Sequence, residues 1–286
     1  MNHKEIVLEP MLYLVATPLG TARDITLRTL DVLASADILA AEDTRTLKKL
    51  MEIHGIALGD RPVIAYHDHN GERARPRILK ALAAGQSVAY ASEAGTPMIA
   101  DPGYHLVREV QSAGFGVTSL PGPSAVITAL TLGGLPTDIF TFAGFLPSTK
   151  SARRKVLKSF ENAQGTLVFY ESPKRISAMI KDAADVLGGA REGRICRELT
   201  KKFEEVIGGT LESLSDALTE RSLKGEIVVL IGKGAAPELS RDTLVAELES
   251  LLKDMSLRDA ADRLAEDTGI KRREIYQIGL ELQKSS

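Results

Sequence analysis

Carboxylates gather in two short segments that each follow an apolar run of the sequence. Glu42 and Asp43 come directly after one such run and precede Arg45, while Glu93 and Asp101 lie in a loop after another. A carboxylate can take a proton from a hydroxyl group, and it can also bind an amine, a sulfonium ion or the hydroxyls of a ribose. The residue types therefore point to a ligand site for a neutral or positively charged group.

Both segments belong to a set of four short loops, each at the end of a predicted strand. Glycine lets the backbone approach a ligand closely, and proline fixes the shape of a loop. Lysine is missing from all four loops, which disfavours a phosphate-rich cofactor. The loops span residues 17–20, 42–45, 92–103 and 121–125.

The elements that must position these loops alternate along the first half of the chain. Short apolar runs are followed by segments of helical periodicity, which is typical of a parallel sheet with crossover helices. In such a sheet ligands lie at the carboxyl ends of the strands, so the four loops are expected to share one edge. Strands are predicted at 12–16, 38–41, 63–66, 87–90 and 117–120, and helices at 25–36, 44–51, 72–84, 104–113 and 125–132.

The rest of the chain divides into two further parts. Residues 136–233 show more antiparallel character. This part begins with the aromatic run 140–145, followed by a basic helix near 150–158, a strand at 166–170, a hairpin predicted across Gly208-Gly209 and the apolar run 227–231. The pattern is wholly helical beyond residue 240, and a capping-box signal at 256–259 favours a helix-turn-helix unit. A solvated helical tail or a dimerisation element is the alternative. The predicted domains are 1–135, 136–233 and 240–286.

Composition and absent motifs exclude several classes of protein. The 286 residues carry a net charge of -2 and one cysteine, Cys196, and show neither a signal peptide nor an apolar run long enough to cross a bilayer. We therefore expect a cytoplasmic protein that is not bound to a membrane. The sequence has no P-loop, dinucleotide fingerprint, nucleophile elbow or zinc-protease motif, and no metal site is predicted.

An ordered set of motifs closely resembles the bacterial ribosomal RNA small-subunit methyltransferase I family, whose members are similar to tetrapyrrole methylases. No single motif is specific, but the set covers essentially the whole chain. The motifs are Thr17-Pro18-Leu19-Gly20, Asp24-Ile25-Thr26-Leu27-Arg28, Ala41-Glu42-Asp43-Thr44-Arg45, Ala94-Gly95-Thr96-Pro97, Asp101-Pro102-Gly103, Pro121-Gly122-Pro123-Ser124-Ala125, Tyr170-Glu171-Ser172-Pro173, Arg197-Glu198-Leu199-Thr200-Lys201 with Glu204-Glu205, and Lys224-Gly225-Glu226.

The resemblance implies two α/β domains of tetrapyrrole methylase type with a cleft for S-adenosyl-L-methionine between them, a small C-terminal helical unit, and a homodimer. The implied reaction methylates the ribose 2′-hydroxyl of a decoding-region cytidine in 16S ribosomal RNA, offered as free RNA or as the small ribosomal subunit. Glu93 departs from the aspartate usual in the family. The expected cofactor-binding residues are Pro18, Leu19, Gly20, Ser92, Glu93, Ala94, Gly95, Pro97, Pro121, Ser124, Ala125 and Tyr170.

Roles in catalysis and RNA binding follow as hypotheses. A general base could be Glu42, Asp43, Glu93, Glu171 or Glu198; we favour Glu42 or Asp43, with Arg45 on the substrate side. The basic stretch at 73–80 is interpreted as a solvated helix face. The residues expected to contact RNA phosphates are Arg153, Arg154, Lys155, Lys201, Lys271, Arg272 and Arg273.

Two rival functions remain open at this point. The same fold could methylate a corrinoid or porphyrin precursor, although such an enzyme would not need a basic C-terminal helical unit. Alternatively, the chain could be a nucleic-acid-binding regulator that senses a ligand with its α/β half. Methyl transfer distinguishes an enzyme from a sensor, whereas cofactor binding alone does not.

Overall fold

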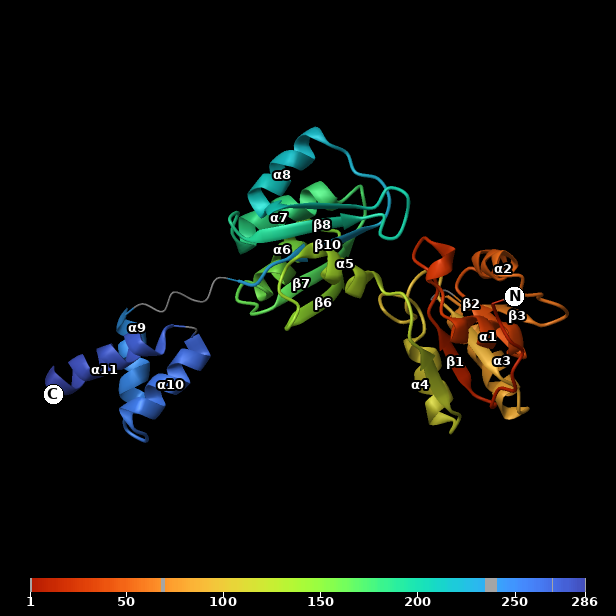
Figure 1. The fold of residues 1–286 in the computed structure, drawn as a ribbon, viewed down its shortest axis with the longest axis horizontal. Coiled ribbons are helices and arrows are strands. Elements are labelled where there is room, and N and C mark those ends of the chain that lie inside the picture. Colours follow the sequence, from red (N-terminus) through yellow and green to blue (C-terminus); the bar gives the residue numbers. More distant parts are fainter. Residues whose placement is uncertain (1, 68–69, 235–240, 269, 286) are drawn as a thin grey trace.

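The computed structural model describes residues 2–67, 70–234, 241–268 and 270–285. Its first sheet, which carries β1, β2 and β3 beside α1–α4 in Figure 1, is parallel throughout. The strand order is β3-β2-β4-β1-β5. This confirms the sheet type predicted from the alternation of apolar runs and helices. The strands are β1 (Leu12–Val15), β2 (Ile38–Ala41), β3 (Val63–Ala65), β4 (Val88–Ala91) and β5 (Val117–Leu120).

Helices cover both faces of this sheet because successive side chains of each strand point to opposite sides. One face packs against α1 (Leu27–Ser35) and α2 (Thr44–Ile53). The other face packs against α3 (Gly71–Ala83) and α4 (Tyr104–Ser112). The helix predicted from residue 25 begins later, because the Thr26 side chain accepts a hydrogen bond from the Thr29 amide and caps α1, after a short 3-10 turn at Ala22–Asp24.

The register of the sheet brings the four loops to one edge, as predicted. Ala91 at the end of β4 lies opposite Val15 on β1 and Ala41 on β2. Leu120 at the end of β5 also lies opposite Val15. The loops that follow these four strands therefore emerge side by side.

The second sheet has the order β6-β7-β10-β8-β9, with β6 parallel to β7 and the other pairs antiparallel. Three helices cover one face, and α5 (Ala125–Gly133) packs on the other. The three helices are α6 (Lys150–Ser159), α7 (Ile176–Leu187) and α8 (Leu211–Glu220), and the strands are β6 (Phe140–Phe145), β7 (Thr166–Glu171), β8 (Glu192–Arg197), β9 (Glu205–Thr210) and β10 (Ile227–Ile231).

The predicted hairpin forms between β8 and β9, but the predicted position of its turn is wrong. Gly208 and Gly209 lie inside β9, and the turn falls at residues 198–204. A Cβ at Gly208 would lie 3.0 Å from the Arg194 side chain, and a Cβ at Gly209 would overlap Ser213. These glycines therefore allow close packing within the sheet rather than a change of chain direction.

Helix α5 precedes the predicted boundary at residue 135, yet its core contacts lie with the second sheet. Val126 and Leu130 share a core with Val168, Val228 and Leu230. A Cβ at Gly133 would overlap Leu230, so helix and strand approach closely. The domain division after residue 135 stays a prediction. Because α5 packs on the second sheet, it belongs to the second α/β unit.

The C-terminal part is helical, with α9 (Arg241–Leu251), α10 (Leu257–Thr268) and α11 (Arg272–Ser285) around one apolar core. The capping signal before α10 is confirmed, because Ser256 Oγ accepts from the Asp259 amide and donates to the Asp259 carboxylate. None of the helices in the described part of the chain is long and apolar enough to span a bilayer.

Candidate active site

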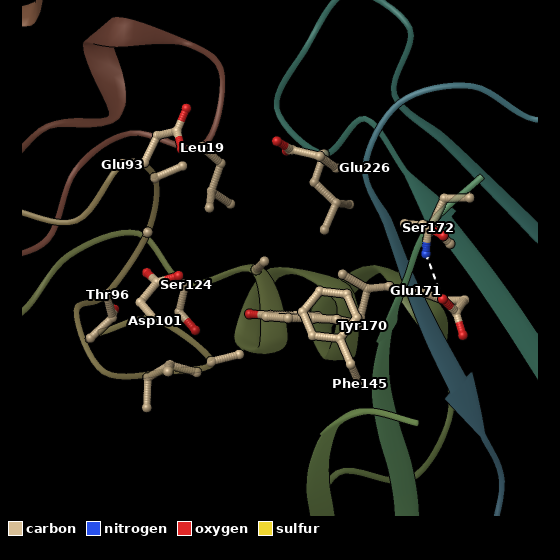
Figure 2. A pocket seen from close by; sticks show the side chains of 18 of the residues that line it. Leu19, Glu93, Thr96, Asp101, Ser124, Phe145, Tyr170, Glu171, Ser172 and Glu226 are labelled. Atoms are coloured by element: carbon tan, nitrogen blue, oxygen red, sulfur yellow. Dashed lines mark hydrogen bonds between the residues drawn. The ribbon is translucent and has the colours of Figure 1, made fainter. Parts of the chain in front are cut away.

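A cleft of about 400 Å³ lies between the loop edge of the first sheet and the second sheet (Figure 2). Its volume is within the range of small-molecule sites. The lining residues are Leu19, Glu42, Glu93, Ala94, Gly95, Thr96, Ile99, Ala100, Asp101, Ser124, Ala125, Phe145, Tyr170, Glu171, Ser172, Pro173, Leu199, Gly225, Glu226, Ile227 and Val228.

Backbone pairing and short hydrogen bonds shape the longest of the four loops. Thr17 and Gly95 exchange two backbone hydrogen bonds of 2.9 Å, which ties the loop after β1 to the loop after β4. Ser92 Oγ donates to the Gly95 carbonyl at 2.8 Å, and Thr96 Oγ1 donates to the Pro123 carbonyl at 2.9 Å. Gly95 has a φ of +80°, so glycine is required to complete this arrangement.

The same loop holds two non-glycine residues in the left-handed region, Met98 at φ +71° and Ala100 at φ +64°. This conformation is costly for residues with a Cβ and is retained where the surroundings demand it, often at ligand sites. The loop wall of the cleft is therefore a constrained structure rather than an ordinary turn.

The cleft is acidic, and no lysine or arginine occurs among the described residues that line it. Its carboxylates come from both sheets: Glu42, Glu93 and Asp101 from the first, and Glu226 from the second. Such a lining favours a cation and disfavours a phosphate.

Tyr170 lies between these carboxylates, and Figure 2 shows its hydroxyl directed across the cleft toward the loop that carries Asp101. Burial raises the pKa of Tyr170 to about 12, and the negative charges of Asp101 and Glu226 add to this effect. The phenol therefore stays protonated at physiological pH and can donate a hydrogen bond.

Glu171 is buried beside Tyr170. Its Oε1 accepts a hydrogen bond from the Ser172 amide at 2.8 Å and lies 3.2 Å from Arg175 Nε (Figure 2). Its other oxygen, Oε2, is buried without a hydrogen-bond partner among the described residues. Side chains alternate along β7, so the Glu171 carboxylate lies on the face covered by α6, α7 and α8 and is directed away from the cleft, opposite to the Tyr170 hydroxyl (Figure 2).

The structure brings most of the predicted cofactor residues together. Leu19, Glu93, Ala94, Gly95, Ser124, Ala125 and Tyr170 all line the cleft. Pro18, Gly20, Ser92, Pro97 and Pro121 lie in the same loops but are not part of the described lining. Ser92 has its structural role in the bond to Gly95, and Gly20 packs against Lys201.

The three predicted catalytic residues occupy different surroundings. Glu42 lines the cleft. Asp43 instead caps α2, accepting hydrogen bonds from the Arg45 and Thr46 amides, and its hydrogen bonds with the Arg45 side chain and backbone lower its pKa. The Arg45 side chain is 91% exposed and pairs with Asp43 at 3.2 Å. A carboxylate held in its charged form by a cap and an ion pair is a poor base, so the geometry favours Glu42.

The predicted RNA contacts on α6 need a correction. Arg153 is 5% exposed and pairs with Asp182 at 2.6 Å, so its guanidinium is part of the core and not available to a phosphate. Arg154 pairs with Asp182 and Asp185, whereas Lys155 is exposed.

The other predicted basic residues lie at the cleft rim and on the C-terminal unit. Lys201 pairs with Glu198 at 3.2 Å and with Glu226 at 2.9 Å, so it joins the hairpin turn to the cleft lining. Lys271 and Arg273 are exposed at the start of α11, and Arg272 pairs with Asp262.

The lining residues that the sequence did not predict are mostly in the second sheet. Phe145 ends β6, Gly225 and Glu226 precede β10, and Leu199 lies in the hairpin turn. Leu199, Gly225 and Glu226 belong to family motifs, but the sequence holds no sign that these segments converge on the cleft. No metal site is predicted around His67. Residues 68 and 69, which follow it, lie outside the described residues.

Comparisons with known proteins agree with this fold. Residues 11–215 match the family model described as Tetrapyrrole (Corrin/Porphyrin) Methylases. The methyltransferase CobJ superposes with a TM-score of 0.60 at 18% identity, covering 80% of this chain and 97% of the other. The uroporphyrin-III C-methyl transferase from Thermus thermophilus complexed with S-adenyl homocysteine gives 0.56 at 19% identity, over 78% and 97% of the two chains. The fold and cleft thus define a methylase of the tetrapyrrole methylase type.

Sequence relatives narrow the class further. Ribosomal RNA small subunit methyltransferase I of Mesorhizobium japonicum is 45% identical over 280 residues, spanning 98% of this chain and 94% of the relative. The protein of the same name from Vibrio cholerae is 44% identical over 95% of each chain. Residues 239–283 match the model of the RsmI C-terminal HTH domain. The chain belongs to the ribosomal RNA small subunit methyltransferase I family.

Proposed function

We propose that this protein transfers a methyl group from S-adenosyl-L-methionine to the ribose 2′-hydroxyl of a decoding-region cytidine in 16S ribosomal RNA. The observation that carries the proposal is the 45% identity along 98% of the chain to a ribosomal RNA small subunit methyltransferase I. The acidic cleft supports it, because its charge and size suit a sulfonium cofactor.

The residues of the cleft fit that cofactor. S-adenosyl-L-methionine, when bound, supplies an electrophilic methyl group on a positively charged sulfur. Glu93 and Asp101 provide negative charge, and Gly95 lets the backbone come close.

The chemistry left to the protein is orientation and proton removal. A ribose hydroxyl is a weak nucleophile, so holding it in line with the methyl group is the largest contribution, worth several kcal/mol. We assign Glu42 as the proton acceptor, since it lines the cleft and Asp43 is committed to the α2 cap. Tyr170, protonated because of its raised pKa, can donate a hydrogen bond within the cleft.

The proposal includes a homodimer in the cytoplasm. Its support is an exposed apolar surface along the edge strand β6 and the preceding segment, where Ile139 is 55% exposed and Phe140 41%. An unpaired strand edge with apolar side chains is a common site of association. Light scattering on the purified chain tests it: Phe140→Lys is expected to yield a monomer, and a wild-type chain that is already monomeric contradicts it.

The decisive experiment offers the protein labelled S-adenosyl-L-methionine with naked 16S RNA, and separately with small subunits from a strain that lacks the modification. Label in a nuclease-resistant dinucleotide containing a ribose-methylated cytidine is the expected result, and the better substrate identifies the recognised RNA state. Glu42→Gln should lower turnover while leaving cofactor affinity near that of the wild type. Absence of label in both RNAs, with measurable cofactor binding, would overturn the proposal in favour of a tetrapyrrole substrate or a sensor.

A further inference from the structure

A second hollow, of about 240 Å³, adjoins the cleft. It is lined by the end of β3, the start of α3 and residues 101–105. Asp101 contributes to both hollows, so only this segment separates them. The proposed reaction does not use this second hollow.

The walls of the second hollow are held in place by buried contacts. The Tyr90 hydroxyl donates to the Pro102 carbonyl at 2.9 Å and anchors the segment that forms one wall. On the other side Arg75 pairs with Glu109 at 2.6 Å and lies against Gly71, where a Cβ would be only 2.9 Å from the guanidinium. Arg75 corrects the interpretation of residues 73–80 as a solvated face, because its side chain is 15% exposed.

The second hollow differs chemically from the cleft. Its described lining carries one carboxylate, that of Asp101, against Arg75 and two histidines. Tyr104 at its mouth is 58% exposed and stacks edge-on with His105 at 5.2 Å. Arg108 is exposed one helical turn further along α4, on the same side as Tyr104.

An exposed aromatic ring beside cationic groups, at the mouth of a small hollow, is suited to an unstacked nucleobase and its phosphate. The position next to the cleft also matters, because an RNA strand that presents one ribose to the cleft must continue past one of its walls.

We propose that this second hollow binds a nucleotide neighbouring the methylated one on the same RNA strand, with its base stacked on Tyr104 and its phosphate near Arg108. The inference rests on the proposed function for the identity of the RNA. It adds a recognition subsite that selects a locally single-stranded target, since a paired base cannot stack on a side chain in this way.

The test measures binding of naked 16S RNA in the presence of S-adenosylhomocysteine, by filter binding over a range of salt concentrations. Tyr104→Ala is expected to weaken RNA binding by about 5- to 150-fold, the range for loss of one base–aromatic stack. Tyr104→Phe keeps the ring and should bind as the wild type does. Arg108→Ala should reduce the slope of the logarithm of the binding constant against the logarithm of the salt concentration by about 1. Lys181→Ala, an exposed control that lines neither hollow, should leave this slope unchanged.

Two further measurements distinguish a lost base stack from damage to the cleft or to the assembly of the protein. Calorimetric affinity for S-adenosylhomocysteine should be unchanged in Tyr104→Ala, and light scattering should give an unchanged oligomeric state. The inference is overturned if Tyr104→Ala binds RNA as tightly as the wild type does. It is also overturned if a change of oligomeric state accounts for the loss of RNA affinity. RNA binding is measured without turnover, so the subsite and the reaction are tested separately. If the wild type binds RNA through Tyr104 but transfers no methyl group, the proposed reaction is contradicted and the subsite remains supported.

Discussion

Thr21 donates a hydrogen bond from Oγ1 to the carbonyl of Thr200 at 2.5 Å, which joins the loop after β1 to the hairpin turn of the second sheet. Thr200, which accepts this hydrogen bond, has a left-handed backbone conformation with φ at +63°. Beside this bond Gly20 packs against Lys201, where any Cβ would overlap the lysine side chain. The two walls of the cleft therefore meet directly at this rim.

Replacing the Thr21 hydroxyl tests how much that contact stabilises the fold. Thr21→Val should lower the free energy of unfolding by about 1 kcal/mol, the usual contribution of one hydrogen bond. Urea denaturation measures it, and Thr21→Asn, which restores a donor, is the matched control. Equal stability of Thr21→Val and the wild type would show that the contact contributes nothing.

The pKa of Tyr170 reports on the charge of the cleft. Burial and the carboxylates Asp101 and Glu226 raise it to about 12. Asp101→Asn removes one of these charges, so the pKa of Tyr170 should fall toward its ordinary value without reaching it. Alkaline titration of tyrosinate absorbance, with Tyr170→Phe subtracted, measures the change. If the pKa of Tyr170 rises or stays constant in Asp101→Asn, the Asp101 carboxylate does not contribute to the raised pKa of Tyr170.

Glu93 offers a test of how closely the carboxylate must be positioned. It lines the cleft with a side chain one methylene longer than the aspartate usual in the family. We expect Glu93→Asp to keep cofactor affinity within about tenfold of the wild type, equal to about 1.4 kcal/mol. Glu93→Gln, which keeps the shape and removes the charge, should bind the cofactor more weakly than Glu93→Asp does. The reverse order of affinities in calorimetry would refute a role for the charge.

Arg153 should matter for stability and not for RNA affinity. Removing Arg153 leaves the buried Asp182 with Arg154 as its remaining ion-pair partner, so Arg153→Ala should lower the free energy of unfolding by about 3 kcal/mol, the lower end of the cost of breaking a buried ion pair. Lys155→Ala, an exposed change on the same helix, should stay within about 0.5 kcal/mol. Thermal and chemical denaturation give these values, and similar losses for both variants would argue against the buried pair.

The acid stability of the first sheet should depend on Asp37. Hydrogen bonds from the Ser87 hydroxyl and amide lower the pKa of Asp37, and they join the starts of β2 and β4. A lowered folded-state pKa means that the stabilisation is present above the unfolded value of about 3.9 and is lost as pH falls through the folded value. Asp37→Asn should therefore cost about 1 kcal/mol near neutral pH and progressively less in acid. A pH-independent difference in unfolding free energy would contradict this assignment.

The first sheet and its loop edge could be predicted because their information is local. Each apolar run precedes its own Gly- and Pro-containing loop, and parallel pairing brings the ends together without further assumptions. The second sheet could not be predicted in the same way, since Gly225 and Glu226 reach the cleft only through the long-range pairing of β10 with β7 and β8.

Two of the predictions that the structure corrects fail for the same physical reason. Gly208-Gly209 carries a turn signal locally, but the glycines are there for the side chains of Arg194 and Ser213. Arg153 belongs to a basic helix by sequence, but its charge is neutralised by Asp182 on α7, 29 residues away. Neither the packing of the glycines nor the ion pair of Arg153 can be read from the neighbouring residues of the chain.

Helix α5 has a mechanical consequence. Its first turn is capped by Ser124 in the lining of the cleft, whereas its body is fixed against β10. Any rotation of the second sheet would carry the whole helix, and Ser124 and Ala125 with it. The loop of Glu93 and Asp101 would stay behind, because Gly95 is paired with Thr17 of the first unit. Both groups of residues line the cleft, so the shape of the cleft and the angle between the two sheets are coupled.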